Sequence, residues 1–276
     1  MKASLNDDSS VNLCCRKCVG WNPSPRPMNK VQRVWSKWLK MGQVDKGIEV
    51  LEAYPLGRTD SDEIHLGLGI LHMKQGRSEL SEEFFNTALA MADENENYWI
   101  SATCLSMLSR ICADRENFDS ALSFADGACK KSTENCLPYG RALALHARAY
   151  CLRLSGDFDG AIEEYKMAIQ IYRNEEDEEG LRAESRNMAT ALFLKGEIDE
   201  AAKLLRDVKE KINPGIPYFD AYSHVDKAIL SFVGGRFEVA RYEIEEARRA
   251  INSCEQILDP DEEMILDYII DGMGQE

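Results

Sequence analysis

A few cysteines and histidines are the residues of this sequence that could bind a metal. Cys14, Cys15 and Cys18 contain a C-x-x-C motif, and two thiolates at that spacing supply half of the ligands of a structural zinc site. The first histidine of the chain is His65, which lies too far along to complete the site at a matching spacing. We therefore favour free thiols in a tail over a zinc site, and we predict neither a metal nor a cofactor.

His65 and His72 stand seven residues apart and share one face of a predicted helix. Both fall at positions that face a neighbouring helix, so we interpret them as packing histidines rather than as ligands. The sequence contains no G-x-x-x-x-G-K-[ST], G-x-S-x-G or H-E-x-x-H motif, and Gly67 and Gly69 lie inside a helical pattern as packing glycines. No nucleophile, base or metal set is assembled, and we predict that the protein is not an enzyme.

Charge and hydropathy narrow the classes of partner and compartment. The 276 residues carry a net charge of −15, divided into +6 on residues 1–40 and −21 on the rest. An acidic body of that size repels nucleic acids and anionic membranes, so we predict neither as a partner. The start of the chain has no apolar signal region, and Cys104, Cys112 and Cys151 lie in apolar helical patterns, as thiols do in a reducing compartment. We predict a cytoplasmic protein.

One short pattern recurs along the chain and divides it into units. A turn residue is followed by a spacer, an apolar residue, an acid, a spacer and a small residue, as in GDFDGA at 156–161 and GEIDEA at 196–201. Weaker copies begin at positions 42, 76, 116 and 235, so that successive turns lie 34, 40, 40, 40 and 39 residues apart. Such a regular spacing indicates tandem structural repeats.

Each unit is predicted to be two helices joined by this turn. The glycine ends the first helix, because a positive φ costs it little, and the acids favour the N-terminal turn of the second helix. Small side chains recur where two antiparallel helices would approach closely. The position five residues after each turn holds Gly47, Ser81, Ala121, Ala161, Ala201 and Ala240.

These columns of small and large residues resemble the tetratricopeptide repeat, from about residue 28 to residue 256. The 40-residue period is similar to the longer version of the repeat found in kinesin light chain, the maltose-regulon activator and Rap-type regulators. The resemblance implies an all-α, right-handed superhelical solenoid of about six antiparallel helix pairs plus a C-terminal capping helix. It also implies a binding or scaffolding protein.

The two ends of the repeat array are indicated by a loss of apolar periodicity at the start and by a proline with adjacent acids near the end. Residues 1–27 lack apolar periodicity, so we expect a disordered N-terminal tail before a repeat domain over 28–276. Near the end, Asp259 and Pro260 with the acids after them indicate the start of a helix, with Asp259 as its cap. We expect that helix to close the last unit, although its apolar Met264 and Tyr268 would also suit a docking partner.

The resemblance further implies that the first helix of every unit lines a concave groove, which in this family usually holds a peptide. The positions carried over are Glu63, Leu66, Ile70, Met73, Thr103, Ser106, Arg110, Leu143, His146, Tyr150, Arg153, Arg186, Asn187, Thr190, Phe193, Tyr222, Val225, Ile229 and Phe232.

Our hypothesis is that this groove binds an acidic or C-terminal segment of another protein. The groove residues that we select are Arg110, His146, Tyr150, Arg153, Arg186, Asn187 and Phe193. Arginine offers a planar fork that suits carboxylates, and the aromatic rings could bury an apolar side chain. In an alternative interpretation, the arginines pair with acids of adjacent helices. The alternative function is a sensor or regulatory module of a larger signalling or transcription regulator.

Overall fold

The computed structural model describes residues 30–54, 61–208, 217–254 and 256–274. The predicted tail over 1–27 and its C-x-x-C motif lie outside the described residues. Every regular element in the described ranges is an α-helix, which confirms the all-α prediction. Twelve of these helices form six consecutive pairs and a thirteenth follows them: α1 (Lys30–Lys40) with α2 (Val44–Glu52), α3 (Ser61–Lys74) with α4 (Ser78–Glu94), α5 (Tyr98–Asp114) with α6 (Phe118–Glu134), α7 (Pro138–Leu154) with α8 (Phe158–Asn174), α9 (Glu178–Lys195) with α10 (Ile198–Val208), α11 (Pro217–Val233) with α12 (Phe237–Asn252), and α13 (Pro260–Met273).

Short turns with one residue of positive φ separate most of the helices. The predicted turns within units are present at five glycines, at positions 42, 76, 156, 196 and 235, and at Glu116. The turns between units have the same conformation at positions 96, 136 and 176, which hold two glutamates and a cysteine. Sequence reasoning missed these second turns because no glycine marks them. From α4 to α9 the chain therefore repeats every 20 residues, as one helix and one turn.

Small side chains hold the two helices of each unit close together, as the repeated columns predicted. Ser81, Ala121, Ala161, Ala201 and Ala240 are completely buried, and the Ser81 hydroxyl donates a hydrogen bond to the Gly69 carbonyl at 2.8 Å. A Cβ atom placed on Gly69 would lie 2.6 Å from the ring of Phe85, so only glycine fits in this part of α3. Both features confirm the predicted close approach.

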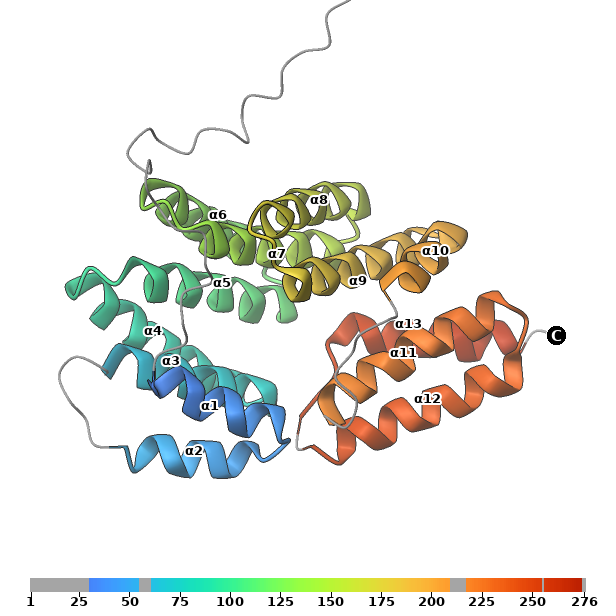
Figure 1. The fold of residues 1–276 in the computed structure, drawn as a ribbon, viewed down its shortest axis with the longest axis horizontal. Coiled ribbons are helices and arrows are strands. Elements are labelled where there is room, and N and C mark those ends of the chain that lie inside the picture. The colour runs from blue at the N-terminus through green and yellow to red at the C-terminus, as the bar shows by residue number, and fades with distance from the viewer. Residues whose placement is uncertain (1–29, 55–60, 209–216, 255, 275–276) are drawn as a thin grey trace, which may run out of the picture.

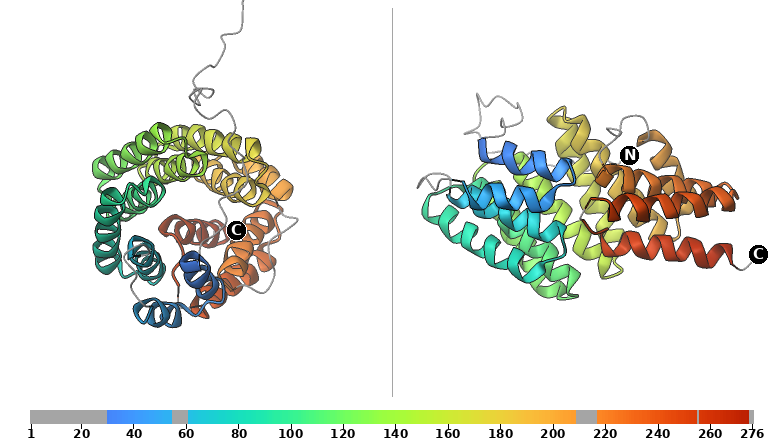
Figure 2. Two further views of the ribbon diagram at one scale, coloured as in Figure 1. Left: turned by 60° about the vertical axis from the view of Figure 1, so that its left-hand side comes forward. Right: turned by 90° about the horizontal axis from the view of Figure 1, so that it is seen from below.

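The pairs wind into a superhelix that almost closes on itself (Figures 1 and 2). Successive first helices of units one to four contact one another, which places them on the inner side of the curve. The segment after α12 reaches back to the first two units. The Gln256 side chain donates to the Leu39 carbonyl, and the Ile257 N–H donates to the Lys74 carbonyl at 3.2 Å. The last unit is thus fastened to the first two by residues about two hundred positions apart.

The final helix, α13, lies inside this ring rather than only at its end (Figure 2). It packs on α11 and α12, as a capping helix should, through the buried Ile265, Leu266 and Ile269. Its N-terminal residues, however, reach α5, α7 and α9 on the opposite wall. The sequence indicated the helix and its packing on the last unit, but it did not indicate the central position.

Two further sequence interpretations concern side chains of the described residues. His72 is buried and stacks on the ring of Phe84, with His65 inclined to the same ring, which confirms their packing role. Cys104 and Cys151 are buried free thiols, whereas Cys112 is only partly buried. Within the described ranges, no helix has the length and apolar character required to cross a membrane.

We predict that the turn residues contribute to stability through their backbone conformation. Gly156 has φ +86° and open space around it, so Gly156→Ala should lower the free energy of unfolding by roughly 1 kcal/mol through the backbone alone. The exposed Glu116 occupies the equivalent position with φ +59°, and Glu116→Gly should raise that free energy by up to about 1 kcal/mol. Urea unfolding midpoints would measure both changes. Shifts in the same direction would contradict this account of the turns.

Candidate functional site

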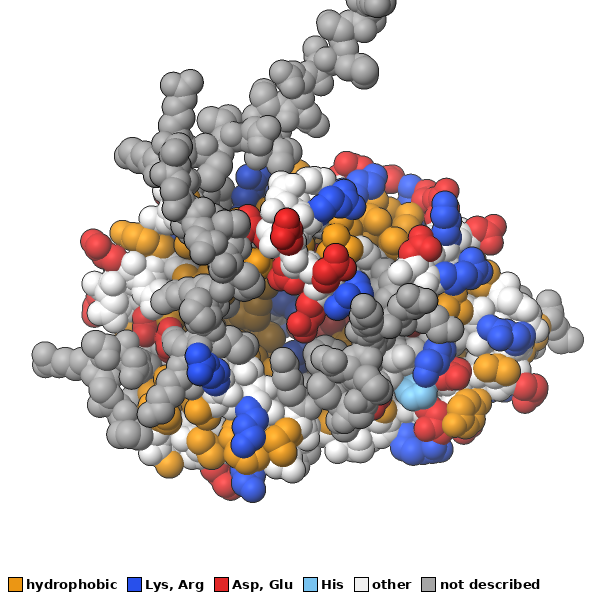
Figure 3. Space-filling view, viewed as in Figure 1, with side chains coloured by type: hydrophobic (Ala, Val, Ile, Leu, Met, Phe, Trp, Pro, Cys, Tyr) orange, Lys and Arg blue, Asp and Glu red, His pale blue; other side chains and the backbone are white. Residues whose placement is uncertain are grey.

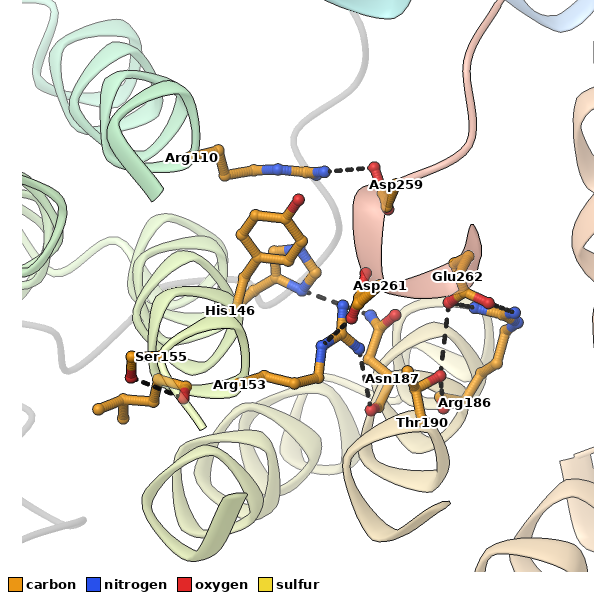
Figure 4. A network of polar contacts seen from close by, with 12 residues as sticks. Arg110, His146, Arg153, Ser155, Arg186, Asn187, Thr190, Asp259, Asp261 and Glu262 are labelled. Atoms are coloured by element: carbon orange, nitrogen blue, oxygen red, sulfur yellow. Dashed lines mark hydrogen bonds and ion pairs between the residues drawn. The ribbon is translucent and has the colours of Figure 1, made fainter. Parts of the chain in front are cut away.

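Three arginines from three successive inner helices converge on the start of α13 (Figure 4). Arg110 lies on α5, Arg153 on α7 and Arg186 on α9, and we refer to them as the arginine triad. Each meets a carboxylate of the stretch Asp259–Glu262, which we refer to as the acidic segment. A single stretch of four residues therefore neutralises cations from units three, four and five.

The three contacts differ in geometry. Arg110 donates from Nη2 to Oδ1 of Asp259 at 2.9 Å. Arg153 forms an ion pair through Nε with Oδ2 of Asp261 at 2.5 Å, and both side chains are about 1% exposed. Arg186 donates two parallel hydrogen bonds of 2.9 Å to Glu262, from Nη1 to Oε1 and from Nη2 to Oε2. This fork-to-fork arrangement makes Glu262 the most specifically recognised of the three acids.

Each guanidinium group of the triad lies over at least one tyrosine ring. The Arg110 guanidinium carbon lies 4.6 Å from the centre of the Tyr150 ring, and that of Arg186 lies 4.6 Å from the Tyr222 ring. The Arg153 guanidinium carbon lies near two rings, 5.4 Å from the centre of Tyr150 and 5.8 Å from that of Tyr165. Cation–π contacts in a desolvated setting favour the charged guanidinium and fix its plane. The triad is thus held in position by groups other than the acidic segment.

His146 and Asn187 form a smaller polar group beside Arg153. The Nδ1 atom of His146 lies 3.0 Å from Oε2 of Glu184, and Nδ2 of Asn187 lies 3.4 Å from the same histidine nitrogen. The backbone carbonyl of Asn187 accepts a hydrogen bond from Nη1 of Arg153 at 3.3 Å. These contacts join α7 to α9 and orient the central arginine.

Arg186 is shared by two carboxylates. Besides the two bonds to Glu262, its Nε lies 2.9 Å from Oδ1 of Asp226 on α11. Burial raises the pKa of Asp226 to about 6, because the charge of Arg186 only partly offsets the desolvation and the nearby Glu262 adds repulsion. One cation facing two buried carboxylates leaves a local excess of negative charge.

The acidic segment also has shifted pKa values of opposite sign. Burial raises the pKa of Asp261 to about 6; Arg153 opposes this shift, whereas Glu262 and Asp259 add to it. Burial acts in the same direction on Asp259, but Arg110, Lys74, Arg153 and His146 more than offset it and hold its pKa well below the ordinary range. Asp259 is therefore firmly ionised, whereas Asp261 is close to exchanging a proton near neutral pH.

All seven residues selected from the sequence lie on the inner side of the array and touch one another or α13. Arg110, Tyr150, Arg153, His146, Arg186 and Asn187 surround the acidic segment. Phe193 lies further along α9, with its ring centre 5.5 Å from that of Tyr268 on α13. The alternative pairing with adjacent helices holds for Arg186 with Asp226, but Arg110 and Arg153 meet residues 149 and 108 positions away.

The acids were the part of the site that sequence reasoning missed. Asp259, Asp261 and Glu262 were interpreted as a helix cap and as a first turn that favours the helix dipole. Asp259 does occupy the N-cap position, but its side chain makes no capping hydrogen bond and pairs with Arg110 instead. The clue was the match between three inner arginines and three closely spaced acids in one chain. The sequence alone could not place them together.

The space-filling view shows a hollow near the middle of one face, where basic, acidic and apolar side chains meet (Figure 3). In the described ranges, no cluster of three or more His, Cys, Asp and Glu residues has the geometry to hold a metal ion. The arrangement is suited to recognition of carboxylates by fixed guanidinium groups. A buried ion pair adds little net stability, but removal of one partner commonly costs about 3–5 kcal/mol, so such pairs determine which occupant fits.

Comparisons with known proteins agree with this architecture. Residues 60–130, which cover α3 to α6 almost completely, match the model of the tetratricopeptide repeat family. Residues 60–130 therefore contain tetratricopeptide repeats. No curated protein matches the sequence.

Several solved structures share the fold of this helical array. BtubC from P. vanneervenii has a TM-score of 0.55 at 17% identity, with 84% of this chain and 95% of BtubC covered. A Rap protein in complex with competence and sporulation factor has a TM-score of 0.60 at 13% identity, over 89% of this chain and 74% of Rap. NprR in complex with its cognate peptide NprX has a TM-score of 0.55 at 15% identity, over 89% of this chain and 70% of NprR. At these identities the likeness shows the fold.

We predict that acidification stabilises the packing around Arg186 within the helical array. The pKa of Asp226 is about 6 in the folded protein, against an ordinary value of 3.8. Protonation therefore favours folding, and this contribution is complete below about pH 4 and lost as the pH rises through 6. Between pH 5 and 7.5 it should decrease by on the order of 1 kcal/mol.

The variant Asp226→Asn removes this titration while Glu262 still pairs with Arg186. Its unfolding free energy should depend less on pH than that of the wild type, and at pH 7.5 it should match or exceed the wild-type value. Asp271→Asn, an exposed acid of α13, is the matched control and should leave the pH dependence unchanged. An equal pH dependence in all three proteins, measured by urea unfolding, would show that Asp226 does not titrate in this range.

Proposed function

We propose that this protein is a non-catalytic interaction module whose inner surface binds an acidic peptide segment of another protein. The arginine triad would bind carboxylates of that segment. The rings of Tyr150, Tyr165 and Tyr222 would hold the guanidinium groups in place and so fix which residues of the segment meet them. The observation that carries the proposal is that all three arginines are engaged by carboxylates of one short segment. A surface that holds such a segment from its own chain has the chemistry to hold one from a partner.

The charge distribution supports this choice of ligand. The chain carries −15 in total, yet three guanidinium groups are concentrated on its inner side. Each has little freedom to turn elsewhere, since the rings of Tyr150, Tyr165 and Tyr222 lie against it. Positively charged groups that are fixed before binding reduce the entropic cost of recognition. An acidic ligand that avoids the outer surface would therefore be directed to the inner one.

Two of the related structures hold a ligand on this fold. NprR is in complex with its cognate peptide NprX, and the Rap protein is in complex with competence and sporulation factor. We carry peptide binding over to this chain as part of the proposal. The specific demand for carboxylates comes from the arginine triad and not from those proteins.

Two of the nine cysteines are unsuited to nucleophilic catalysis. Burial raises the pKa of Cys151 to about 11 and raises that of Cys104 further, so neither is a thiolate at neutral pH. Both are free in the structure, which suits the reducing cytoplasm that the sequence indicates.

We predict that a partner captured by the full chain depends on the triad. Purified wild type and the variants Arg110→Gln and Arg186→Gln would be used for capture from a native lysate, followed by cross-linking and mass spectrometry. A true partner should be retained by the wild type, should cross-link to α5, α7 or α9 through an acidic stretch, and should decrease at least tenfold with either variant. Removal of one partner of a buried charged contact costs enough for such a loss.

Arg249→Gln is the control, because Arg249 is exposed on α12 and pairs with Glu246 of its own helix. Circular dichroism and thermal midpoints would show that the variants are folded. Retention of the same proteins by all four chains, or cross-links confined to the outer helices, would count against the inner surface as the binding site.

A further inference from the structure

We infer that α13 and its acidic segment are an internal ligand, and that the partner is a protein segment of the same design, which binds by replacing them. The inference rests on the proposed function and adds what the partner must look like. Its design is Asp-x-Asp-Glu at the start of an amphipathic helix. The exchange gives the inner surface a closed state, occupied by its own chain, and an open state, available to the partner.

The order and spacing of the three acids match those of the three arginines. Asp259, Asp261 and Glu262 meet Arg110, Arg153 and Arg186 in the same order, so the ligand lies across three units with its chain running from α5 towards α9. Proline between the first two acids fits the first position of a helix, where its missing N–H is not needed. A peptide with the same charges at other spacings would leave at least one arginine of the triad without a carboxylate from the ligand.

The helix after the acids supplies most of the burial. Ile265, Leu266 and Ile269 are completely buried against the apolar side chains of α11, which include Val225 and Ile229. Ion pairs that replace hydration contribute little net affinity, whereas apolar burial scales with the area removed from water. The partner therefore needs the apolar face for affinity and the acids for register. An acidic stretch without a following apolar helix would not displace α13.

The triad can survive the departure of its internal ligand. When Glu262 leaves, Arg186 keeps its ion pair with Asp226, and its guanidinium stays over the Tyr222 ring. Arg153 keeps the Asn187 carbonyl and two tyrosine rings. Because α13 follows the six helix pairs, it can leave without unthreading any of them. The ion pair with Asp226 would thus keep Arg186 paired in the open state, whereas in the closed state Glu262 already pairs with it.

The covalent tether makes the internal ligand a strong competitor. A segment joined by a short connection has an effective concentration on the order of millimolar, so a free peptide of equal affinity competes poorly. Weakening the internal copy should therefore strengthen binding of the external one. This reversal separates an internal ligand from a helix that is merely structural.

The test uses a fluorescein-labelled peptide with the sequence of residues 256–274 and measures its anisotropy with the full chain. We expect weak binding to the wild type and at least tenfold tighter binding to Glu262→Gln, in which the internal copy has lost its bidentate contact. Asp271→Asn, the same type of change at an exposed site of α13, should bind the peptide as the wild type does. Adding Arg186→Gln to Glu262→Gln should abolish the gain.

Two peptide variants test the design of the ligand. In one variant Asp259, Asp261 and Glu262 are replaced by Asn, Asn and Gln, and in the other Ile265, Leu266 and Ile269 are replaced by serine. Each variant should bind Glu262→Gln at least tenfold more weakly than the original peptide does. Hydrogen–deuterium exchange gives a second readout that does not depend on the peptide assay. The amides of α13 should exchange faster in Glu262→Gln than in the wild type, and faster still when the unlabelled peptide is added.

The outcomes separate this inference from the proposed function. If Glu262→Gln binds the peptide no better than the wild type and α13 keeps its protection, α13 is a structural cap and the inference is wrong. Capture of a partner through the triad would then still support the proposed function. If exchange shows that α13 is released but no peptide binds, the triad does not recognise acidic segments in trans, and both proposals fall.

Discussion

Three arginines in the middle of an acidic protein, one buried and two largely covered, are the constraint on which the rest of the structure depends. A guanidinium group removed from water must meet carboxylates, and here they come from the four residues that begin α13. That requirement draws α13 into the centre of the ring, although its apolar face needs only the last unit. It also fastens the segment after α12 against the first two units, where Gln256 and Ile257 bind the backbone.

The repeats make this convergence possible. From α4 to α9, helices of about seventeen residues alternate with short turns, and small residues at the crossings let the two helices of a unit pack closely. The first helices of successive units line the inside of the ring, as Figure 2 shows, and the triad occupies a different position on each of α5, α7 and α9. In a solenoid whose units contact only their neighbours, the first and last units do not interact. In this protein, the acidic segment couples units three, four and five to the last one.

Much of the candidate site was predictable, because the residues of the inner surface follow from the repeat register. Arg110, Arg153 and Arg186 could be assigned to that surface, and all three lie there. Their partners were not predictable, since the acids of 259–262 also have an ordinary explanation at the start of a helix. Local rules favour acids in a first turn whether they face solvent or a distant arginine. Asp226 on α11 was missed for a similar reason, because a charged residue inside a helix is usually exposed.

The sequence by itself determined the helices, the turns marked by glycine, the pairing of helices and the inner position of the triad. These features depend on patterns within about forty residues, where periodicity reports directly which face is buried. Only the tertiary structure decided that the ring closes and that α13 occupies its centre. Those features join residues 149 and 217 positions apart, such as Arg110 with Asp259 and Leu39 with Gln256. Curvature is the sum of many small packing rotations, so no single stretch of sequence specifies where the chain meets itself.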